Sequence, residues 1–172
     1  MLLELLHAWR DFYIVTATAG ASLIGAMFVV ISIGVGILTR ERLPGAHAYI
    51  TSTVVHMGGV VLASLWTMVP SLEWASFGAV LILGGIVGLA YEVATATAVR
   101  HFRADWTDYV WYAAVPLIAY AGFILAGAMS IVGNAGTVEV LALAVVLLLI
   151  CGVRNAWDMI LVFVIRPERD RK

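Results

Sequence analysis

Four ionisable side chains placed inside apolar stretches are the residues of this chain that could do chemistry. His56, Glu92, Arg154 and Asp158 each lie within a long run of Val, Leu, Ile, Ala and Gly. Where such runs cross a bilayer, a central charge costs roughly 2.5–3.5 kcal/mol to insert, so charges there are rare and indicate function. A histidine beside two carboxylates can bind and release protons or small cations. These residues form our candidate site.

The composition indicates that the apolar runs do cross a membrane. Of the 172 residues, 63% are apolar and 12% are charged, against roughly 45–50% and about 25% in soluble domains. The mean hydropathy is +1.01. We therefore expect an all-α integral membrane bundle whose surroundings are the lipid bilayer. The charge pattern does not indicate nucleic-acid binding, so we expect no nucleic acid among its partners.

Five apolar segments are each long enough to cross a hydrocarbon core of about 30 Å. They cover residues 13–38, 48–70, 73–99, 109–132 and 138–165, separated by short turns rich in Gly, Pro, Asn or charge. Residues 1–11 place four apolar side chains on one helical face, which favours a short helix in the membrane interface. We expect one membrane domain over residues 1–172, with an interfacial helix at 1–11, five transmembrane helices and a cytoplasmic tail at 166–172.

Basic residues lie mostly on one side of these predicted spans. Outside the spans, only Arg10 lies on the side of the N-terminus, and the others lie on the opposite side: Arg40, Arg42, Arg100, Arg103, Arg166, Arg169, Arg171 and Lys172. Cytoplasmic loops carry the excess of Lys and Arg. We therefore expect the N-terminus outside and the C-terminus in the cytoplasm, in a bacterial inner membrane.

The ionisable residues are predicted to lie at similar depth. His56, Glu92 and Asp158 each lie about eight residues from the cytoplasmic end of their span, or about 12 Å along the helix. Arg154 precedes Asp158 by four residues, so these two can pair on one helix face. We expect Arg154 to reach Glu92 as well. That contact would join all four side chains in one polar layer.

Two further polar residues, Asn155 and Ser32, are predicted to border this layer. Ser32 continues a face of small residues along the first span, and Glu92 likewise follows several glycines. Small residues let membrane helices approach one another closely. We therefore expect the polar layer to face protein or water and to be shielded from lipid.

The layer allows more than one interpretation. Its charges could form a structural staple that fixes the register of segments 73–99 and 138–165, or a conduit with His56, Glu92 and Asp158 as exchange sites for protons or small ions. A metal ion on those three residues is chemically allowed. We nevertheless expect no metal and no cofactor, since the usual two-histidine ligation of haem would need a second buried histidine. Neither H-E-x-x-H nor G-x-S-x-G occurs, so we expect no enzyme.

The first span also carries a pattern close to A-x-L-x-G-x-x-F-V-x-x-S, formed by Ala21, Leu23, Gly25, Phe28, Val29 and Ser32. In this helix and in its plan of five spans, the chain resembles a group of small uncharacterised bacterial membrane proteins. The resemblance implies a regulatory role towards a membrane protein partner. It assigns no catalytic residue.

Together these features predict an oligomeric channel or transporter-like protein that passes protons or small ions through the polar layer. Glycine and alanine faces on several spans offer more packing surface than one small bundle needs, which favours a homo-oligomer. The alternative is an accessory or regulatory subunit of another membrane complex that transports nothing itself.

Overall fold

Long helices follow the apolar segments of the sequence. The structure, a computed structural model, describes residues 2–34, 43–99 and 110–165, and every regular element in these ranges is a helix. The prediction of an all-α chain is therefore confirmed for the described residues. The elements in chain order are α1 (Leu2–Ala8), α2 (Arg10–Gly34), α3 (Leu43–Trp66), α4 (Trp74–Val99), the π-helix η1 (Val110–Ala114), α6 (Val115–Ile131) and α7 (Thr137–Ile165).

Three of these helices are long and apolar enough to cross a membrane. The qualifying stretches are Arg10–Ser32 in α2, Trp74–Thr95 in α4 and Thr137–Asp158 in α7. Shorter apolar stretches cover Thr51–Trp66 in α3 and Val115–Ile131 in α6. These helices indicate membrane insertion. The basic segments 40–42, 100–103 and 166–172 lie outside the described residues, so the orientation that they indicate stays a prediction.

Several boundaries differ from those expected: α1 ends at Ala8, α2 begins at Arg10 within the segment 1–11, and α3 ends at Trp66. We placed Pro44 and Gly45 in a turn, but α3 already begins at Leu43. A proline in the first helical turn lacks only an N–H that would have no partner there, so it does not prevent the helix. The segment 109–132 was expected to be one regular helix, whereas its described part begins as a π-helix.

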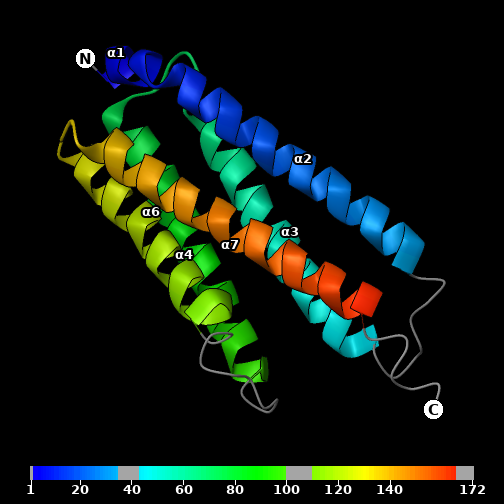
Figure 1. Cartoon of the computed structure of the whole chain (residues 1–172). Coiled ribbons are helices and arrows are strands. Elements are labelled where there is room, and N and C mark those ends of the chain that lie inside the picture. The colour runs from blue at the N-terminus through cyan, green and yellow to red at the C-terminus, as the bar shows by residue number, and fades with distance from the viewer. Residues whose placement is uncertain (1, 35–42, 100–109, 166–172) are drawn as a thin grey trace, which may run out of the picture.

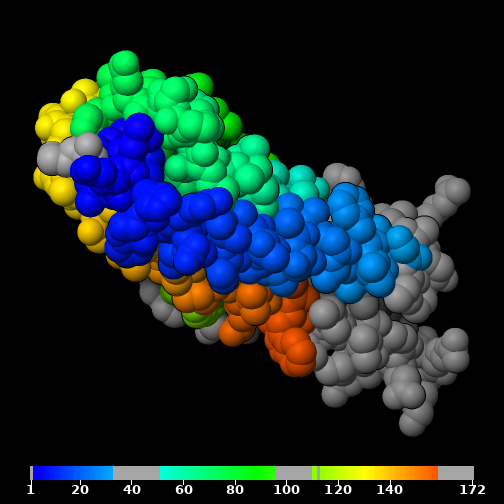
Figure 2. Space-filling view, turned by 90° about the horizontal axis from the view of Figure 1, so that it is seen from above, coloured from blue at the N-terminus to red at the C-terminus, as the bar shows by residue number. Residues whose placement is uncertain are grey.

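The five long helices run alongside one another, with α7 in a central position (Figure 1). α7 contacts α2, α3 and α6, while α4 packs chiefly against α6 at one edge of the bundle. At the opposite edge, α2 lies along the outside with α3 and α7 on its two sides (Figure 2). Segments of α3, α4 and α6 therefore lie close enough to combine side chains in the interior.

Glycines allow the close approach of α4 and α6. A Cβ atom built on Gly127 would lie 2.6 Å from the carbonyl oxygen of Gly78, and one on Gly85 would lie 2.9 Å from that of Tyr120. Both positions therefore need glycine, as in other closely packed membrane helices. The contact fixes the side of α6 that carries Tyr120 against α4.

A glycine also ends α6. Gly133 has a φ of +72°, a left-handed conformation that glycine adopts without a Cβ penalty. Its N–H donates to the carbonyl of Ser130 at 2.8 Å, and Asn134 N–H donates to that of Met129 at 2.9 Å. This arrangement is a Schellman-type helix end. The turn predicted at 133–136 is confirmed, and it directs α7 back along α6.

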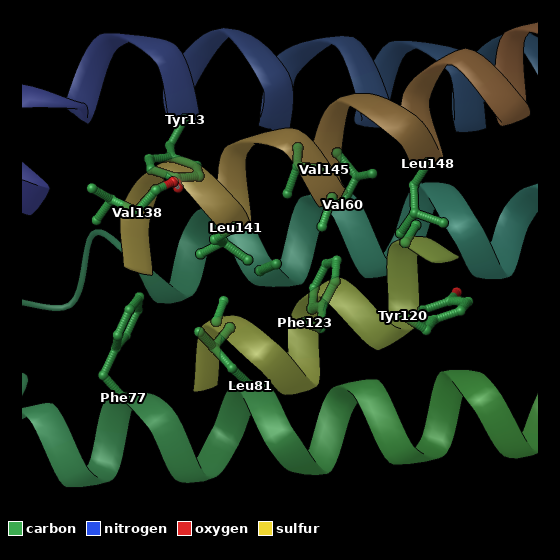
Figure 3. Close-up of a cluster of buried hydrophobic side chains, with 14 of the residues drawn as sticks. Tyr13, Val60, Phe77, Leu81, Tyr120, Phe123, Val138, Leu141, Val145 and Leu148 are labelled. Atoms are coloured by element: carbon green, nitrogen blue, oxygen red, sulfur yellow. Dashed lines mark hydrogen bonds between the residues drawn. The ribbon is translucent and has the colours of Figure 1, made fainter. Parts of the chain in front are cut away.

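An apolar core fills the space between the helices. Leu141, Val145 and Leu148 on α7 face α3 and α6, where they lie near Val60 and Phe123 (Figure 3). All five are buried, with relative exposures of 4% or less.

Candidate functional site

His56 and Glu92 meet inside the bundle. His56 lies on α3 and Glu92 on α4, and each is completely buried, at 0% relative exposure. His56 Nε2 lies 3.2 Å from Glu92 Oε1. Two residues singled out from the sequence are therefore direct neighbours across a helix interface.

Each ring nitrogen of His56 has a further polar neighbour. Ser52 Oγ, one turn away on α3, lies 3.0 Å from Nε2, and the hydroxyl of Tyr120 on α6 lies 3.0 Å from Nδ1. Tyr120 donates when Nδ1 is unprotonated, and its oxygen accepts when Nδ1 carries a proton. The group can therefore hold His56 as either neutral tautomer or as imidazolium. We call Ser52, His56, Glu92 and Tyr120 the His56 cluster.

Glu92 depends on His56 for its charge balance. Neither of its carboxyl oxygens accepts a well-formed hydrogen bond from the described residues. An isolated ionised carboxylate in an apolar interior is strongly disfavoured. Glu92 is therefore stable as a neutral carboxylic acid, or as a carboxylate against a His56 imidazolium. In both forms the pair holds one exchangeable proton.

Gly88 makes room for the tyrosine of this cluster. A Cβ atom on Gly88 would overlap the ring of Tyr120. Phe123, one turn further along α6, contacts the same ring with centroids 6.0 Å apart. The absence of a side chain at position 88 thus lets Tyr120 lie between α4 and α6 and reach His56.

A second set of polar contacts joins α7 to η1. The thiol of Cys151 donates to the carbonyl oxygen of Trp111 at 3.0 Å, and Asn155 Nδ2 donates to the Cys151 sulfur at 3.6 Å. In a π-helix the carbonyl of Trp111 would bond to the N–H of residue 116. That residue is Pro116, which has no N–H, so the thiol supplies the missing donor.

Asn155 is buried beside Cys151, and among the described residues no hydrogen bond joins it to the His56 cluster. It is 1% exposed, and its Oδ1 has no hydrogen-bond partner among the described residues. The predicted position of Asn155 beside the polar layer stays a prediction.

Arg154 and Asp158 pair with each other on the side of α7 next to η1. Arg154 Nε donates to Asp158 Oδ2 at 2.9 Å, and the two side chains are 40% and 24% exposed. The Arg154 guanidinium also lies 5.9 Å from the centre of the Trp111 ring. The expected contact from Arg154 to Glu92 is not formed, because Glu92 faces His56 instead. The polar residues that were expected in one layer therefore form two groups: His56 and Glu92 in the interior, and Arg154 and Asp158 partly exposed at the surface.

A metal site on His56, Glu92 and Asp158 is not assembled. Among the side chains that the structure describes, no three His, Cys, Asp or Glu residues lie together as a ligand set. Asp158 instead forms the partly exposed pair with Arg154. The three residues that the sequence allowed as ligands are thus divided between separate groups.

Ser32 lies away from the His56 cluster. It is exposed on α2, and its hydroxyl donates to the carbonyl of Phe28 on the same helix at 2.8 Å. The small residues of α2 occupy two faces, and the inward one contains Gly20, where an added Cβ would lie 3.0 Å from Val61 Cγ2 on α3. Ser32 belongs to the other face. Its expected place beside the polar layer was therefore wrong.

A separate group of hydroxyls lies between α2 and α3. The hydroxyls of Thr16 and Ser64 are 3.0 Å apart, and the Thr67 hydroxyl donates to the carbonyl of Ser64 at 2.7 Å. All three residues are buried, at 6% exposure or less. We call Thr16, Ser64 and Thr67 the hydroxyl cluster. Their sequence positions alone predict no role for these three residues.

Tyr120 was the most important residue that the sequence analysis missed. Its signal was its position, since it lies within an apolar span and not at a membrane interface, where tyrosines usually gather. A buried tyrosine hydroxyl usually has a hydrogen-bond partner. The sequence therefore indicates that Tyr120 needs a partner, although it does not identify that partner as His56.

Comparisons with protein-family models, with curated proteins and with solved structures found no match. The chemistry must therefore be argued from the site. An imidazole and a carboxyl group in contact, flanked by two hydroxyls and enclosed by apolar helices, can take up, transfer and release a proton.

Proposed function

We propose that the protein conducts protons across a membrane and that His56 and Glu92 are its proton-binding pair. The observation that carries the proposal is the contact of 3.2 Å between two completely buried ionisable side chains. Proton uptake changes the pair from neutral His56 with ionised Glu92 to a form with no net charge. The added proton resides on Glu92 Oε1 or on His56 Nε2, and it can move between these atoms along their contact.

Protons fit this site better than larger ions. Tyr120, Ser52 and the pair itself are all buried, at 4% exposure or less, and Gly88 lies against the Tyr120 ring. An ion that crosses a protein needs ligands or water along a pore. A proton instead moves along hydrogen bonds between neighbouring groups, which the close packing around His56 provides.

The proposal includes five membrane spans, formed by α2, α3, α4, α6 with η1, and α7. Its support is the outer surface of the bundle, because helices surrounded by lipid are apolar on their outer faces too. Each helix exposes a large apolar side chain by 60% or more: Val15 (66%), Leu62 (70%), Leu83 (62%), Ile118 (62%) and Leu143 (62%). α1 then lies in the interface.

The basic residues of the sequence favour a bacterial inner membrane with the N-terminus outside and the C-terminus in the cytoplasm. Reporter fusions that are active on only one side of the membrane test this orientation at the C-terminus. We also propose a homo-oligomer, supported by the partly exposed Arg154–Asp158 pair. A charged pair on an apolar surface is better accommodated against protein than against acyl chains.

The same pair supports a second candidate function, an accessory subunit that binds another membrane protein. Arg154 and Asp158 lie beside the exposed side chains of Val153 and Trp157, which are 52% and 59% exposed. A photo-crosslinking amino acid at position 153 separates the two kinds of contact in cells. Adducts of two copies of this chain support the homo-oligomer, and adducts with a different membrane protein support the accessory role.

The test of conduction is proton flux into liposomes that contain the purified protein. A dye trapped inside reports the flux that follows an imposed pH difference and a potassium potential. We expect the wild type to conduct and Glu92→Gln to fall to the level of protein-free vesicles, because the amide cannot bind or release the proton. Glu73→Gln is the matched control, since Glu73 is exposed in the turn before α4. Equal flux in wild type and Glu92→Gln would refute the proposal.

A further inference from the structure

One stripe of residues along α3 connects the His56 cluster with the hydroxyl cluster. Ser52, His56, Val60 and Ser64 follow one another at intervals of four residues, and Thr67 continues the stripe. All of them are buried, with relative exposures between 0% and 6%. Val60 is the only member of this stripe without a polar side chain.

The stripe changes its neighbours along the helix. An interval of four residues advances the direction of a side chain by about 40° around a helix. His56 accordingly faces Glu92 and Tyr120 on α4 and α6, whereas Ser64 faces Thr16 on α2. The stripe therefore runs from one polar group to the other, and Val60 lies where it passes α7.

Val60 closes this interval by close packing. It is completely buried, and it lies in the apolar core near Val145 and Leu148 of α7 (Figure 3). On the side of α2, a Cβ atom built on Gly20 would lie 3.3 Å from Val60 Cγ1. Val60 lies about 6 Å along the helix from both His56 and Ser64. His56 and Ser64 are therefore about 12 Å apart along the helix, too far for a direct hydrogen bond between them.

We propose that Val60 is the apolar barrier between the proton-binding His56 cluster and the hydroxyl cluster, whose hydroxyls relay protons without storing them. This inference rests on the proposed conduction of protons and assigns its controlling step. Apolar constrictions block conduction because they exclude water and offer no hydrogen bond. A proton leaves the His56–Glu92 pair along the Thr16–Ser64 hydroxyls only when water or a moving side chain bridges Val60. Each hydroxyl then accepts a proton while it donates its own to the next group, and the last proton passes to water outside the bundle.

The experiment compares Val60→Thr with Val138→Thr in the liposome assay. Both substitutions replace a completely buried valine by a side chain of nearly the same shape, but only position 60 lies on the stripe. We expect Val60→Thr to raise proton flux about tenfold over Val138→Thr, since a hydroxyl at the barrier provides the missing hydrogen bond. Equal flux in the two variants would overturn the barrier.

Two further variants keep this result interpretable. Val60→Ala opens the barrier without a buried hydroxyl, and its flux should also exceed that of Val138→Ala. This second comparison serves if the threonine variants fail to fold. In the double variant Val60→Thr with Glu92→Gln, the added flux should disappear. Protons must still pass through the His56 cluster, and that cluster can no longer bind and release them without the Glu92 carboxyl group. Retained flux would mean a leak elsewhere and would count against the barrier. The comparison of wild type with Glu92→Gln tests the proposed function separately.

Discussion

The two ionisable pairs of this bundle are built in different ways. His56 and Glu92 come from different helices and are wholly buried, with hydroxyls of Ser52 and Tyr120 around the imidazole. Arg154 and Asp158 come from one helix and are partly exposed beside an aromatic ring. The first pair exists only when α3, α4 and α6 pack together, whereas the second needs only a helical turn. The first pair should therefore respond more strongly to any change in packing.

The largest difference between the His56–Glu92 pair and the Arg154–Asp158 pair should appear in the stability of variants that remove one residue of the pair. His56→Ala leaves a buried carboxyl group without its neighbour, so we expect a loss of about 3 kcal/mol in the free energy of unfolding. The same change combined with Glu92→Gln should recover part of that loss, because the amide carries no charge. Reversible unfolding in bicelles measures both values. If the losses caused by His56→Ala alone and by Glu92→Gln alone simply add in the double variant, His56 and Glu92 are not energetically coupled.

A second test perturbs the His56 cluster without altering an ionisable residue. Gly88→Ala places a methyl group where the Tyr120 ring lies, so we expect a destabilisation of about 2 kcal/mol from overpacking and a reduced proton flux. Gly84→Ala is the matched control on the same helix, where an added Cβ meets nothing within 4 Å. It should change stability by less than about 0.5 kcal/mol. Similar effects of both substitutions would show that Tyr120 is not held by Gly88.

A third test uses the two buried tyrosine hydroxyls. Tyr120→Phe removes the neighbour of His56 Nδ1, and Tyr13→Phe removes a hydrogen bond of 2.9 Å to the carbonyl of Val138. Each should destabilise the protein by about 1 kcal/mol. Only Tyr120→Phe should lower proton flux, because Tyr13 contacts neither member of the His56–Glu92 pair. A loss of flux in Tyr13→Phe alone would place the route elsewhere in the bundle.

The sequence predicted the features that depend on local spacing. Hydrophobic run lengths located the helices, Gly133 located a turn, and an interval of four residues paired Arg154 with Asp158. Depth along each span placed His56, Glu92 and Asp158 at one level, and the structure brings the first two into contact. Depth alone does not fix the rotation of a helix about its axis, and for that reason it brought Asp158 into the same layer.

The partners of each residue depended on packing that the sequence does not reveal. Tyr120 reaches His56 because Gly85 and Gly88 bring α6 against α4. The π-helix at the start of α6 depends on Pro116 together with a thiol from α7. In both places, residues distant in the sequence determine the geometry. A pattern within one helix predicts that a polar residue is buried, but it does not predict which helix supplies its partner.

The smallest effect should come from the Arg154–Asp158 pair itself. A pair at this spacing on one helix contributes about 0.5 kcal/mol, because its two side chains are partly exposed. A double-mutant cycle of Arg154→Ala and Asp158→Asn, measured by the same unfolding assay, gives this coupling directly. Proton flux should remain within twofold of the wild type in Asp158→Asn, since Glu92 faces His56 and not this pair. A coupling as large as that between His56 and Glu92 would mean that both pairs are held by helix packing. Such a coupling would indicate that a neighbouring subunit covers this side of α7. The Arg154–Asp158 pair would then depend on the assembly of subunits, as the His56–Glu92 pair depends on the folding of one chain.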